Sequence, residues 1–482
     1  MAGKSKVLDY EPLRNPRRST VAHDAGFSPG ATGVSSTDLE SSFDSGVRTS
    51  GVATPSAQTE PSQILKRGHA LTFAGVFLFT FLLFFRPYEF STSLSWLSKG
   101  ALITAILTLV FFIPTQLGLE NRITVRTREI NLVLLIALLA LISIPFALDR
   151  FRAWNGFLEY MKIVIMFVVT VNVVRSEKQL KALLLLVLVA TCILSFSAIN
   201  DYRLGNLVLK GVRIQGAIGG MFENPNDLAL HFVTFFPIVI VLALSSRYMI
   251  AKLIYFAAAA AALGGVIVTF SRGGFLGMIF VIAALVWKLS RKNFFIVGVV
   301  SALLVFFLLI LAPDAYRDRI STTGDGSSVA RMGELKRSIF LSVRNPFFGV
   351  GMDNYILFSD REQGTHNSYT QVSAEIGFPG MVVYVLFLIA TLKRVAKMPD
   401  PKSIDKKKRR LPYLAIGVQA GLIGYMVSSF FAAVAFLWYV YYLAAYAICI
   451  SRLHQSALAE TNAVNVSNNG PSAYLAEPKL SP

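Results

Sequence analysis

Histidines and arginines near two polar loops are the residues of this sequence best suited to group-transfer chemistry. Five histidines occur, and only His231 and His366 fall near these loops. Histidine is the side chain whose pKa is best matched to proton transfer near neutral pH. His231 lies one turn into an apolar segment, which favours packing or a hydrogen bond. His366 lies in a loop and is a candidate general base, although a lone loop histidine is more often an ordinary surface residue.

Arg272 stands between two apolar segments that meet with almost no loop, after Ser271 and before a Gly-Gly pair. A guanidinium at such a turn is suited to bidentate binding of a phosphate. An arginine near the end of a membrane span also commonly extends toward lipid headgroups, so both interpretations stay open.

A second loop carries Arg213, another candidate anion contact, and ends at Asn224 and Asn226. These asparagines flank Pro225 where an apolar segment begins. Asparagine before a helix and proline in its first turn are typical of a helix start. Capping alone is therefore a sufficient explanation for both.

Residues 328–344 are predicted to form an amphipathic helix, because apolar residues recur there at intervals of three and four. Arg331 and Glu334 fall largely off the apolar stripe. The helix either lies on a membrane surface with its charges in water, or covers an external cavity and directs arginines toward an anionic ligand. The stripe consists of Val329, Met332, Leu335, Ile339, Phe340 and Val343.

The composition shows which elements must position these residues. The chain has 482 residues, of which 54% are hydrophobic and 15% charged. A soluble domain is about a quarter charged, so the composition argues against a cytosolic globular enzyme. Apolar segments long enough to cross a bilayer recur, which predicts an all-α polytopic transmembrane helical bundle of about twelve spans. We place these at 69–86, 96–117, 130–147, 154–174, 180–198, 228–246, 249–270, 273–289, 293–312, 378–396, 411–429 and 431–450.

Three regions follow from this pattern. Residues 1–67, rich in Ser, Thr, Gly and Pro, are predicted to be a disordered cytoplasmic N-terminal tail. Residues 68–452 form the transmembrane domain, with long external loops at 199–227 and 313–377 that contain the polar candidates. Residues 453–482 are predicted to be a disordered cytoplasmic C-terminal tail.

The chain has a net charge of 46 − 28 = +18, and the distribution of its basic residues indicates how the protein is oriented in the membrane. Lys and Arg are concentrated in alternate short loops, which places those loops and both termini in the cytoplasm and both long loops outside. Nucleic-acid binding is not expected, since the basic residues lie mainly between spans. The two cysteines, Cys192 and Cys449, fall inside apolar segments, so neither a disulfide framework nor a cysteine metal site is expected.

Four motifs, in this order and on the same predicted side, resemble the O-antigen ligase and O-antigen polymerase superfamily of bacterial membrane glycosyltransferases. The resemblance covers about residues 200–395. The motifs are Phe222-Glu223-Asn224-Pro225-Asn226; Ser271-Arg272-Gly273-Gly274; the Arg331 helix followed by Asn345-Pro346-Phe347-Phe348-Gly349-Val350-Gly351; and His366-Asn367-Ser368-Tyr369 followed by Glu375-Ile376-Gly377-Phe378-Pro379-Gly380.

The resemblance implies glycan transfer from undecaprenyl pyrophosphate to an acceptor hydroxyl on the external face of the bacterial inner membrane, without a metal or other cofactor. It implies His366 and Arg272 as catalytic residues, with inversion at the anomeric carbon. The candidate pyrophosphate- and substrate-binding residues are Arg213, Arg331, Asn226, Asn367 and Glu375. The implied partners are the lipid-linked glycan donor, a glycan, lipid A core or other hydroxyl acceptor, membrane lipids and other polysaccharide-assembly proteins.

Alternatives remain at this level. The sequence does not separate a polymerase, which extends a lipid-linked chain, from a ligase, which passes the finished chain to another acceptor. A polytopic transporter has a similar span layout, but usually concentrates polar residues in broken helices at mid-membrane. A membrane scaffold for polysaccharide assembly is a third class.

Overall fold

The computed structural model describes residues 63–90, 92–207, 214, 216, 218–219, 222–289, 326–359, 364–405 and 408–468. Every regular element in these ranges is helical, which confirms the predicted all-α bundle. The α-helices are α1 (Gln63–Phe85), α2 (Pro87–Phe90), α3 (Gly100–Glu120), α4 (Arg128–Ser143), α5 (Arg150–Val173), α6 (Glu177–Arg203), α7 (Pro225–Ser245), α8 (Met249–Val268), α9 (Arg272–Leu289), α12 (Gly326–Arg344), α13 (Ser368–Ala396), α14 (Arg410–Ser428) and α15 (Trp438–Asn468). Short 3-10 turns are η1 (Thr92–Lys99), η2 (Ile144–Phe146), η4 (Tyr355–Phe358), η5 (Pro401–Ser403) and η7 (Ser429–Phe431).

Short polar side chains set where several helices begin. Thr127 accepts a hydrogen bond from the backbone of Ile130 at the start of α4, and Ser176 accepts one from Gln179 at the start of α6. Asp149 caps α5 in the same way. Each cap satisfies a backbone N–H that has no partner within the helix, which matters more in a bilayer than in water.

Ten helical segments within the described residues are long and apolar enough to cross a membrane. They match ten of the predicted spans, from the first at 69–86 to the one at 411–429. The predicted span at 293–312 lies outside the described residues, as does Arg213.

The last predicted span, at 431–450, differs from the structure. The chain leaves helical geometry after η7 and resumes only at α15, which is not among the ten apolar segments. Several tyrosines, among them Tyr439, Tyr441 and Tyr446, are fully buried in α15. A helix enclosed by other helices need not be apolar all round, because it has little contact with lipid. Helix α15 also continues to Asn468, beyond the predicted boundary at 452.

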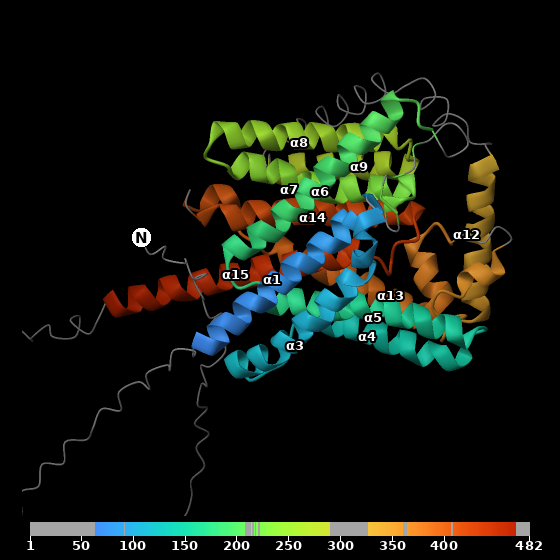
Figure 1. The fold of residues 1–482 in the computed structure, drawn as a ribbon, viewed down its shortest axis with the longest axis horizontal. Coiled ribbons are helices and arrows are strands. Elements are labelled where there is room, and N and C mark those ends of the chain that lie inside the picture. The colour runs from blue at the N-terminus through green and yellow to red at the C-terminus, as the bar shows by residue number, and fades with distance from the viewer. Residues whose placement is uncertain are drawn as a thin grey trace, which may run out of the picture.

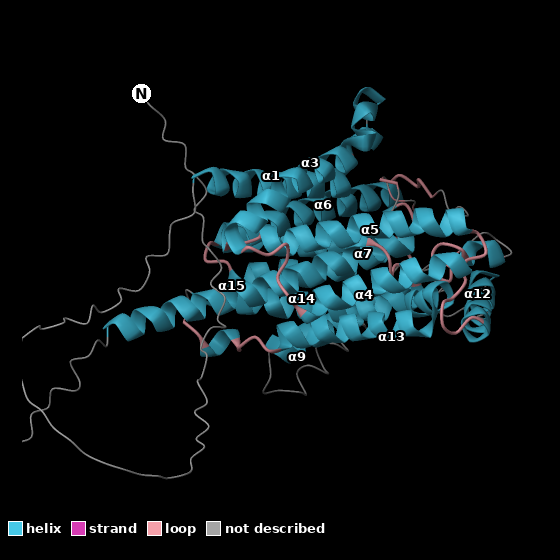
Figure 2. Cartoon of the chain, turned by 90° about the horizontal axis from the view of Figure 1, so that it is seen from below, coloured by secondary structure: helices cyan, strands magenta, loops and turns pink. Residues whose placement is uncertain are grey.

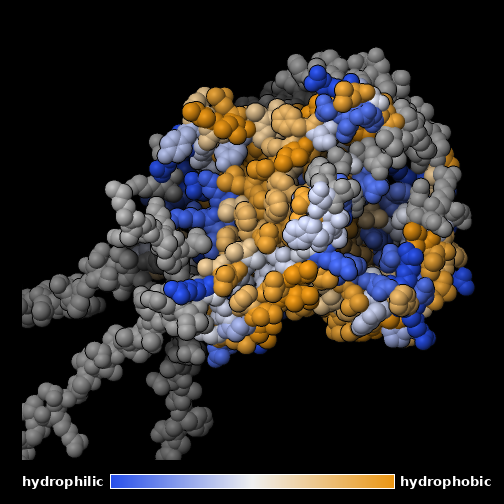
Figure 3. Space-filling view, in the orientation of Figure 1, coloured by the Kyte–Doolittle hydropathy of each residue, from blue (hydrophilic) through white to orange (hydrophobic). Residues whose placement is uncertain are grey.

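The long helices run roughly parallel, and α12 lies across one end of them (Figure 1). We call this end, where α7, α9 and α13 begin, the α12 end. The view from below shows the same arrangement, with α12 seen along its axis beside α13 (Figure 2). Apolar residues cover the middle of the bundle and hydrophilic residues gather toward its two ends, as expected of a protein that spans a bilayer (Figure 3).

Helices α7 and α14 form the centre of the bundle and are its most buried apolar segments. Glycines allow their close approach. A Cβ atom at Gly421 would lie 2.4 Å from the carbonyl oxygen of Thr234, and one at Gly424 would lie 2.8 Å from a methyl group of Val233. Small residues at such contacts are the usual basis of helix packing in membranes.

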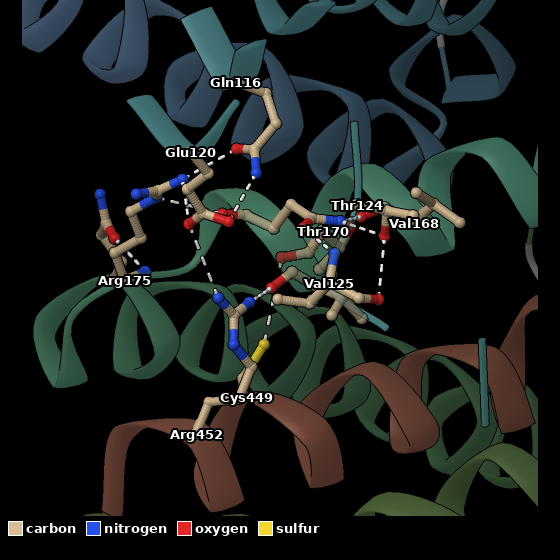
Figure 4. A network of polar contacts seen from close by, with 12 residues as sticks. Gln116, Glu120, Thr124, Val125, Val168, Thr170, Arg175, Cys449 and Arg452 are labelled. Carbon is tan, nitrogen blue, oxygen red and sulfur yellow. Dashed lines mark hydrogen bonds and ion pairs between the residues drawn. The ribbon is translucent and has the colours of Figure 1, made fainter. Parts of the chain in front are cut away.

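A buried ionic cluster fastens the opposite end (Figure 4). The Glu120 carboxylate of α3 lies 2.7 Å from the Arg175 guanidinium and 3.8 Å from that of Arg452 on α15. Gln116 bridges the same groups, accepting from Arg175 at 2.8 Å and donating to Glu120 at 3.0 Å. Arg452 also donates to the carbonyl of Val171 in α5. One carboxylate therefore ties α3, α5, α15 and the α5–α6 turn together.

We expect Glu120→Gln to destabilise the fold by about 3 kcal/mol, because it removes the carboxylate that lies between the buried Arg175 and the largely buried Arg452 guanidinium groups. Thermal unfolding in nanodiscs measures the loss. Asp405→Asn is the matched control, since Asp405 is an exposed carboxylate outside the membrane-crossing segments and exposed charges contribute about 0–1 kcal/mol. Equal stability of the two variants would contradict the role assigned to Glu120.

Candidate functional site

Arg272 is the first residue of α9 and follows a sharp turn. Phe270 has a φ of 51°, in the left-handed region that non-glycine residues rarely occupy. Ser271 then caps α9 by accepting a hydrogen bond from the backbone of Gly274 at 3.2 Å. The turn therefore fixes where the Arg272 side chain leaves the helix.

The glycines after Arg272 bring α9 against its neighbours. A Cβ atom at Gly274 would lie 2.6 Å from the Cβ of Ala229 in α7, and one at Gly273 would lie 2.7 Å from the Cβ of Phe431 in η7. The first turns of α7 and α9 consequently lie side by side at the α12 end.

The predicted helix start at Asn224 is confirmed. Its side chain accepts a hydrogen bond from the backbone of Asn226 at 2.9 Å, and α7 begins at Pro225. Asn226 is partly buried in the first turn of α7 and so lies at the same end as Arg272. Asp227, which follows it, interacts electrostatically with Tyr439 of α15.

His366 lies two residues before the start of α13 and has a φ of 53°. A histidine held in the left-handed region is under backbone strain, and residues strained in this way cluster at functional sites. The side chain is half-buried. Asn367 after it is buried and accepts hydrogen bonds from the backbones of Tyr369 and Thr370 at 2.9 and 3.0 Å. The Asn367 carboxamide oxygen therefore acts as the cap of α13.

The non-helical segment 432–437 and η7 lie between the two candidate catalytic residues. Phe431 packs against Gly273, next to Arg272. One residue later, the carbonyl of Ala432 accepts a hydrogen bond from Ser368 at 2.7 Å, and the backbone of Val434 donates to Ser368 at 2.9 Å. The Arg272 turn and the His366 loop are thus held to consecutive parts of one segment.

Helix α12 confirms the helix predicted at 328–344, and its Glu334 is a centre of hydrogen bonds. The Glu334 carboxylate accepts from Tyr355 at 2.7 Å, from Ser359 at 3.1 Å and from Arg337 at 3.1 Å. Tyr355 also donates to the Glu334 carbonyl at 2.9 Å. These bonds fix the rotation of α12 about its axis.

Arg331 and Glu334 of α12 are the charged groups that act on His366. Burial lowers the pKa of the His366 imidazole below its ordinary value, Arg331 lowers it further, and Glu334 partly opposes them by raising it. The imidazole is therefore neutral at neutral pH, which is the form that accepts a proton.

Glu375 lies in another cluster. Its carboxyl takes a hydrogen bond from the Asp353 backbone and interacts with Arg152 of α5. Arg152 in turn lies 3.1 Å from the Asp353 carboxylate. The carbonyl of Glu375 accepts from the backbone of Gly351 at 2.9 Å. The described contacts of Glu375 thus join α5, the 349–354 loop and α13.

The structure unites His366 and Arg331, and it holds Arg272 and Asn226 at the same end of the bundle. The sequence pattern indicated Glu334 only as a charge off the apolar stripe; its spacing of three residues from Arg331 is the signal that would have placed the two on one face. Tyr355 and Ser359 carried no sequence signal, because only the fold brings them to Glu334. Within the described residues, no group of three or more His, Cys, Asp or Glu side chains could hold a metal ion.

Comparison with known families agrees with the motifs. Residues 257–385, from within α8 to within α13, match the model of the O-antigen ligase family. The match contains Arg272, Arg331, His366 and Glu375, and the predicted resemblance to the O-antigen ligase superfamily is confirmed for this segment. A search of curated proteins finds no match to the chain.

The charges around His366 predict how its reactivity depends on pH. Diethylpyrocarbonate modifies neutral imidazole, so in the wild type the modification of His366 should persist below pH 6.5. In Arg331→Gln the pKa of His366 rises, and modification should be lost at higher pH than in the wild type. In Glu334→Gln the pKa falls and the loss should move to lower pH. Mass spectrometry of the peptide that contains residue 366 measures the titration; identical curves in all three proteins would refute the assignment.

Proposed function

We propose that the protein transfers a glycan from undecaprenyl pyrophosphate to an acceptor hydroxyl at the α12 end of the bundle. The observation that carries this proposal is the pairing of His366, a strained and half-buried imidazole with a lowered pKa, with the arginine of α12. A base within electrostatic reach of a cation is suited to a reaction that deprotonates a hydroxyl while an anion departs. The family match over residues 257–385 supports the same reaction class.

In the proposed step, the acceptor hydroxyl oxygen attacks the anomeric carbon of the donor sugar. The new carbon–oxygen bond forms as the bond to the pyrophosphate oxygen breaks, and the hydroxyl proton passes to His366. Undecaprenyl pyrophosphate leaves with the bonding electrons. Direct attack opposite the leaving group inverts the configuration at the anomeric carbon.

The arginines would stabilise the leaving group. Negative charge on the pyrophosphate grows as the bond breaks, so a cation fixed beside it stabilises the transition state more than the ground state. Arg272 begins α9 directly after the Ser271 cap, and Arg331 lies on α12, whose rotation the Glu334 hydrogen bonds fix. Arg213, outside the described residues, would add a third cation, and Asn226 a polar contact beside Arg272.

The Lys and Arg pattern supports an orientation for this chemistry. We assign both termini to the cytoplasm and the α12 end to the external face of a bacterial inner membrane. The candidate polar residues gather at that end of the bundle, and hydrophilic residues border a hollow beside α12 (Figure 3). This arrangement favours a lipid-linked glycosyltransferase over a transporter, whose binding site usually lies at mid-membrane.

The first test is purified protein supplied with one defined undecaprenyl-pyrophosphate repeat unit, with products resolved by size. A ladder of products identifies a polymerase; product only after lipid A core or another acceptor is added identifies a ligase. His366→Ala should lower the rate about 10²–10⁴-fold, the range typical of a lost general base. His454→Ala is the matched control, because His454 is another partly buried histidine, in α15. Near wild-type transfer by a folded His366→Ala variant would contradict the assignment.

Arg272 gives a separate prediction. Arg272→Lys keeps the charge but loses the planar pair of donors, and Arg272→Ala loses both. We expect a graded fall in kcat, larger for alanine, with a smaller change in KM, because the interaction strengthens in the transition state. Equal loss in both variants together with a lower unfolding temperature would indicate a structural role instead.

A further inference from the structure

Most helices that pack on a protein turn an apolar face inward and a polar face outward, and α12 does the reverse. The side against the bundle is polar: Glu334 is 4% exposed, and Ser338 and Ser342 are fully buried. Ser342 is hydrogen-bonded to Ser373 of α13 at 2.7 Å. Helix α12 is therefore attached to the bundle largely by hydrogen bonds, and Leu341 adds a buried apolar contact.

The apolar stripe predicted for this helix faces away from the bundle. Phe340 is 60% exposed and Val343 64% exposed. Helical spacing puts them on one face with three other exposed residues, because positions three and four apart lie one above the other. The stripe contains Val329, Met332, Ile339, Phe340 and Val343. An apolar face of this extent marks contact with a membrane or with another molecule.

This stripe continues into surfaces that face lipid. Phe347, just after α12, is 69% exposed. Its neighbour Phe348 stacks on Phe146 of η2, which follows α4, with ring centroids 4.1 Å apart. The backbone of Phe378 donates to the carbonyl of Pro346 at 2.8 Å, which fixes the end of α12 to the kink of α13.

The kink is where the exposed apolar face of α13 begins. Gly377 has a φ of 83°, and Phe378, Val382 and Leu386 follow at intervals of four residues with their side chains exposed. These residues lie in one of the membrane-crossing segments. The outward stripe of α12 is therefore an extension of the lipid-facing surface of the bundle.

The exposed charges on α12 have one sign. Lys336 lies within the outward stripe and Arg344 at its edge, and both are exposed. Glu334, the acidic residue in the described helix, is buried. Basic residues beside an apolar stripe are typical of helices that lie at the boundary between headgroups and acyl chains, where phosphates are anionic.

We propose that α12 is an interfacial helix whose outward stripe is inserted into the headgroup and upper acyl region of the leaflet at the α12 end, with lipid phosphates around Lys336 and Arg344. The perpendicular placement of α12 relative to the spans fits this position (Figures 1 and 2). The occupant of the stripe is lipid rather than a second copy of the chain, because the stripe is continuous with the surface that the spans already present to lipid.

The position has a consequence that rests on the proposed function. Arg331 lies on the inward side of the same helix, so a bilayer-anchored α12 holds this arginine at the height of the phosphate groups. A lipid-linked pyrophosphate lies at that height. The membrane would then help to position the site for its donor.

Tryptophan scanning tests the proposal independently of activity. Phe340→Trp and, as a second variant, Val343→Trp are reconstituted in nanodiscs with lipids brominated near the headgroup or deep in the acyl chain. Fluorescence is compared with that of the wild type, which has four tryptophans, to isolate the added residue. Phe196→Trp on α6, a 67% exposed position within a span, is the lipid-facing reference.

We expect the added tryptophan to emit at shorter wavelength than tryptophan in water. Lipid brominated near the headgroup should quench as large a fraction of its fluorescence as it does for the tryptophan at position 196. Iodide in solution should quench it little. Strong iodide quenching with none by brominated lipid would overturn the proposal, because it places the stripe in water. Short-wavelength emission that neither quencher reduces would also overturn it, since the stripe would then be covered by protein. Improper folding of one variant leaves the other to decide.

Discussion

The constraint on which the site depends is the break in helical structure at 432–437. Backbone groups that leave a helix inside a membrane bundle must find partners within the protein, since lipid offers none. Here α13 and α14 provide them: Ser368 bonds both Ala432 and Val434, Gln371 accepts from Ala435 at 3.3 Å, and Tyr425 donates to Val434 at 3.1 Å. Because these bonds connect the segment to the first turn of α13, and Phe431 packs on the start of α9, the His366 loop and the Arg272 turn cannot move independently.

This break also shows where reading the sequence fails. Hydropathy measures how well a segment transfers to lipid, and residues 430–440 are apolar throughout, so a span starting at 431 was the natural prediction. The local sequence does not indicate the break, because Ser368 and Gln371, whose side chains bond the non-helical backbone, are distant in sequence. The sharp turn before Arg272 and the caps at Asn224 and Ser176 were predictable, because their chemistry is local. Glu375, in contrast, was not predictable in this way. A sequence motif groups it with His366, but its contacts in the fold are with Asp353 and Arg152.

Periodicity predicted α12 but could not say which side would face the bundle. An apolar stripe is buried by default in a soluble protein, yet here Glu334 and two serines face inward. A buried polar face is stable only when its groups are satisfied, and Tyr355, Ser359 and Ser373 meet that requirement. Such bonds are directional, so they fix the rotation of α12 more narrowly than apolar packing would. That rotation is what brings Arg331 and Glu334 to His366.

The same charges provide a way to reset the base in the proposed reaction. Arg331 depresses the pKa of His366 when no anion is near, which favours a neutral imidazole before the reaction. A bound pyrophosphate would offset the arginine charge and raise the pKa of His366, so the imidazole becomes a stronger base when the donor is present. In the proposed reaction, departure of undecaprenyl pyrophosphate would leave Arg331 to act on the imidazolium again and promote loss of the proton. The histidine would then accept a proton most readily with donor bound and release it most readily once the leaving group has departed.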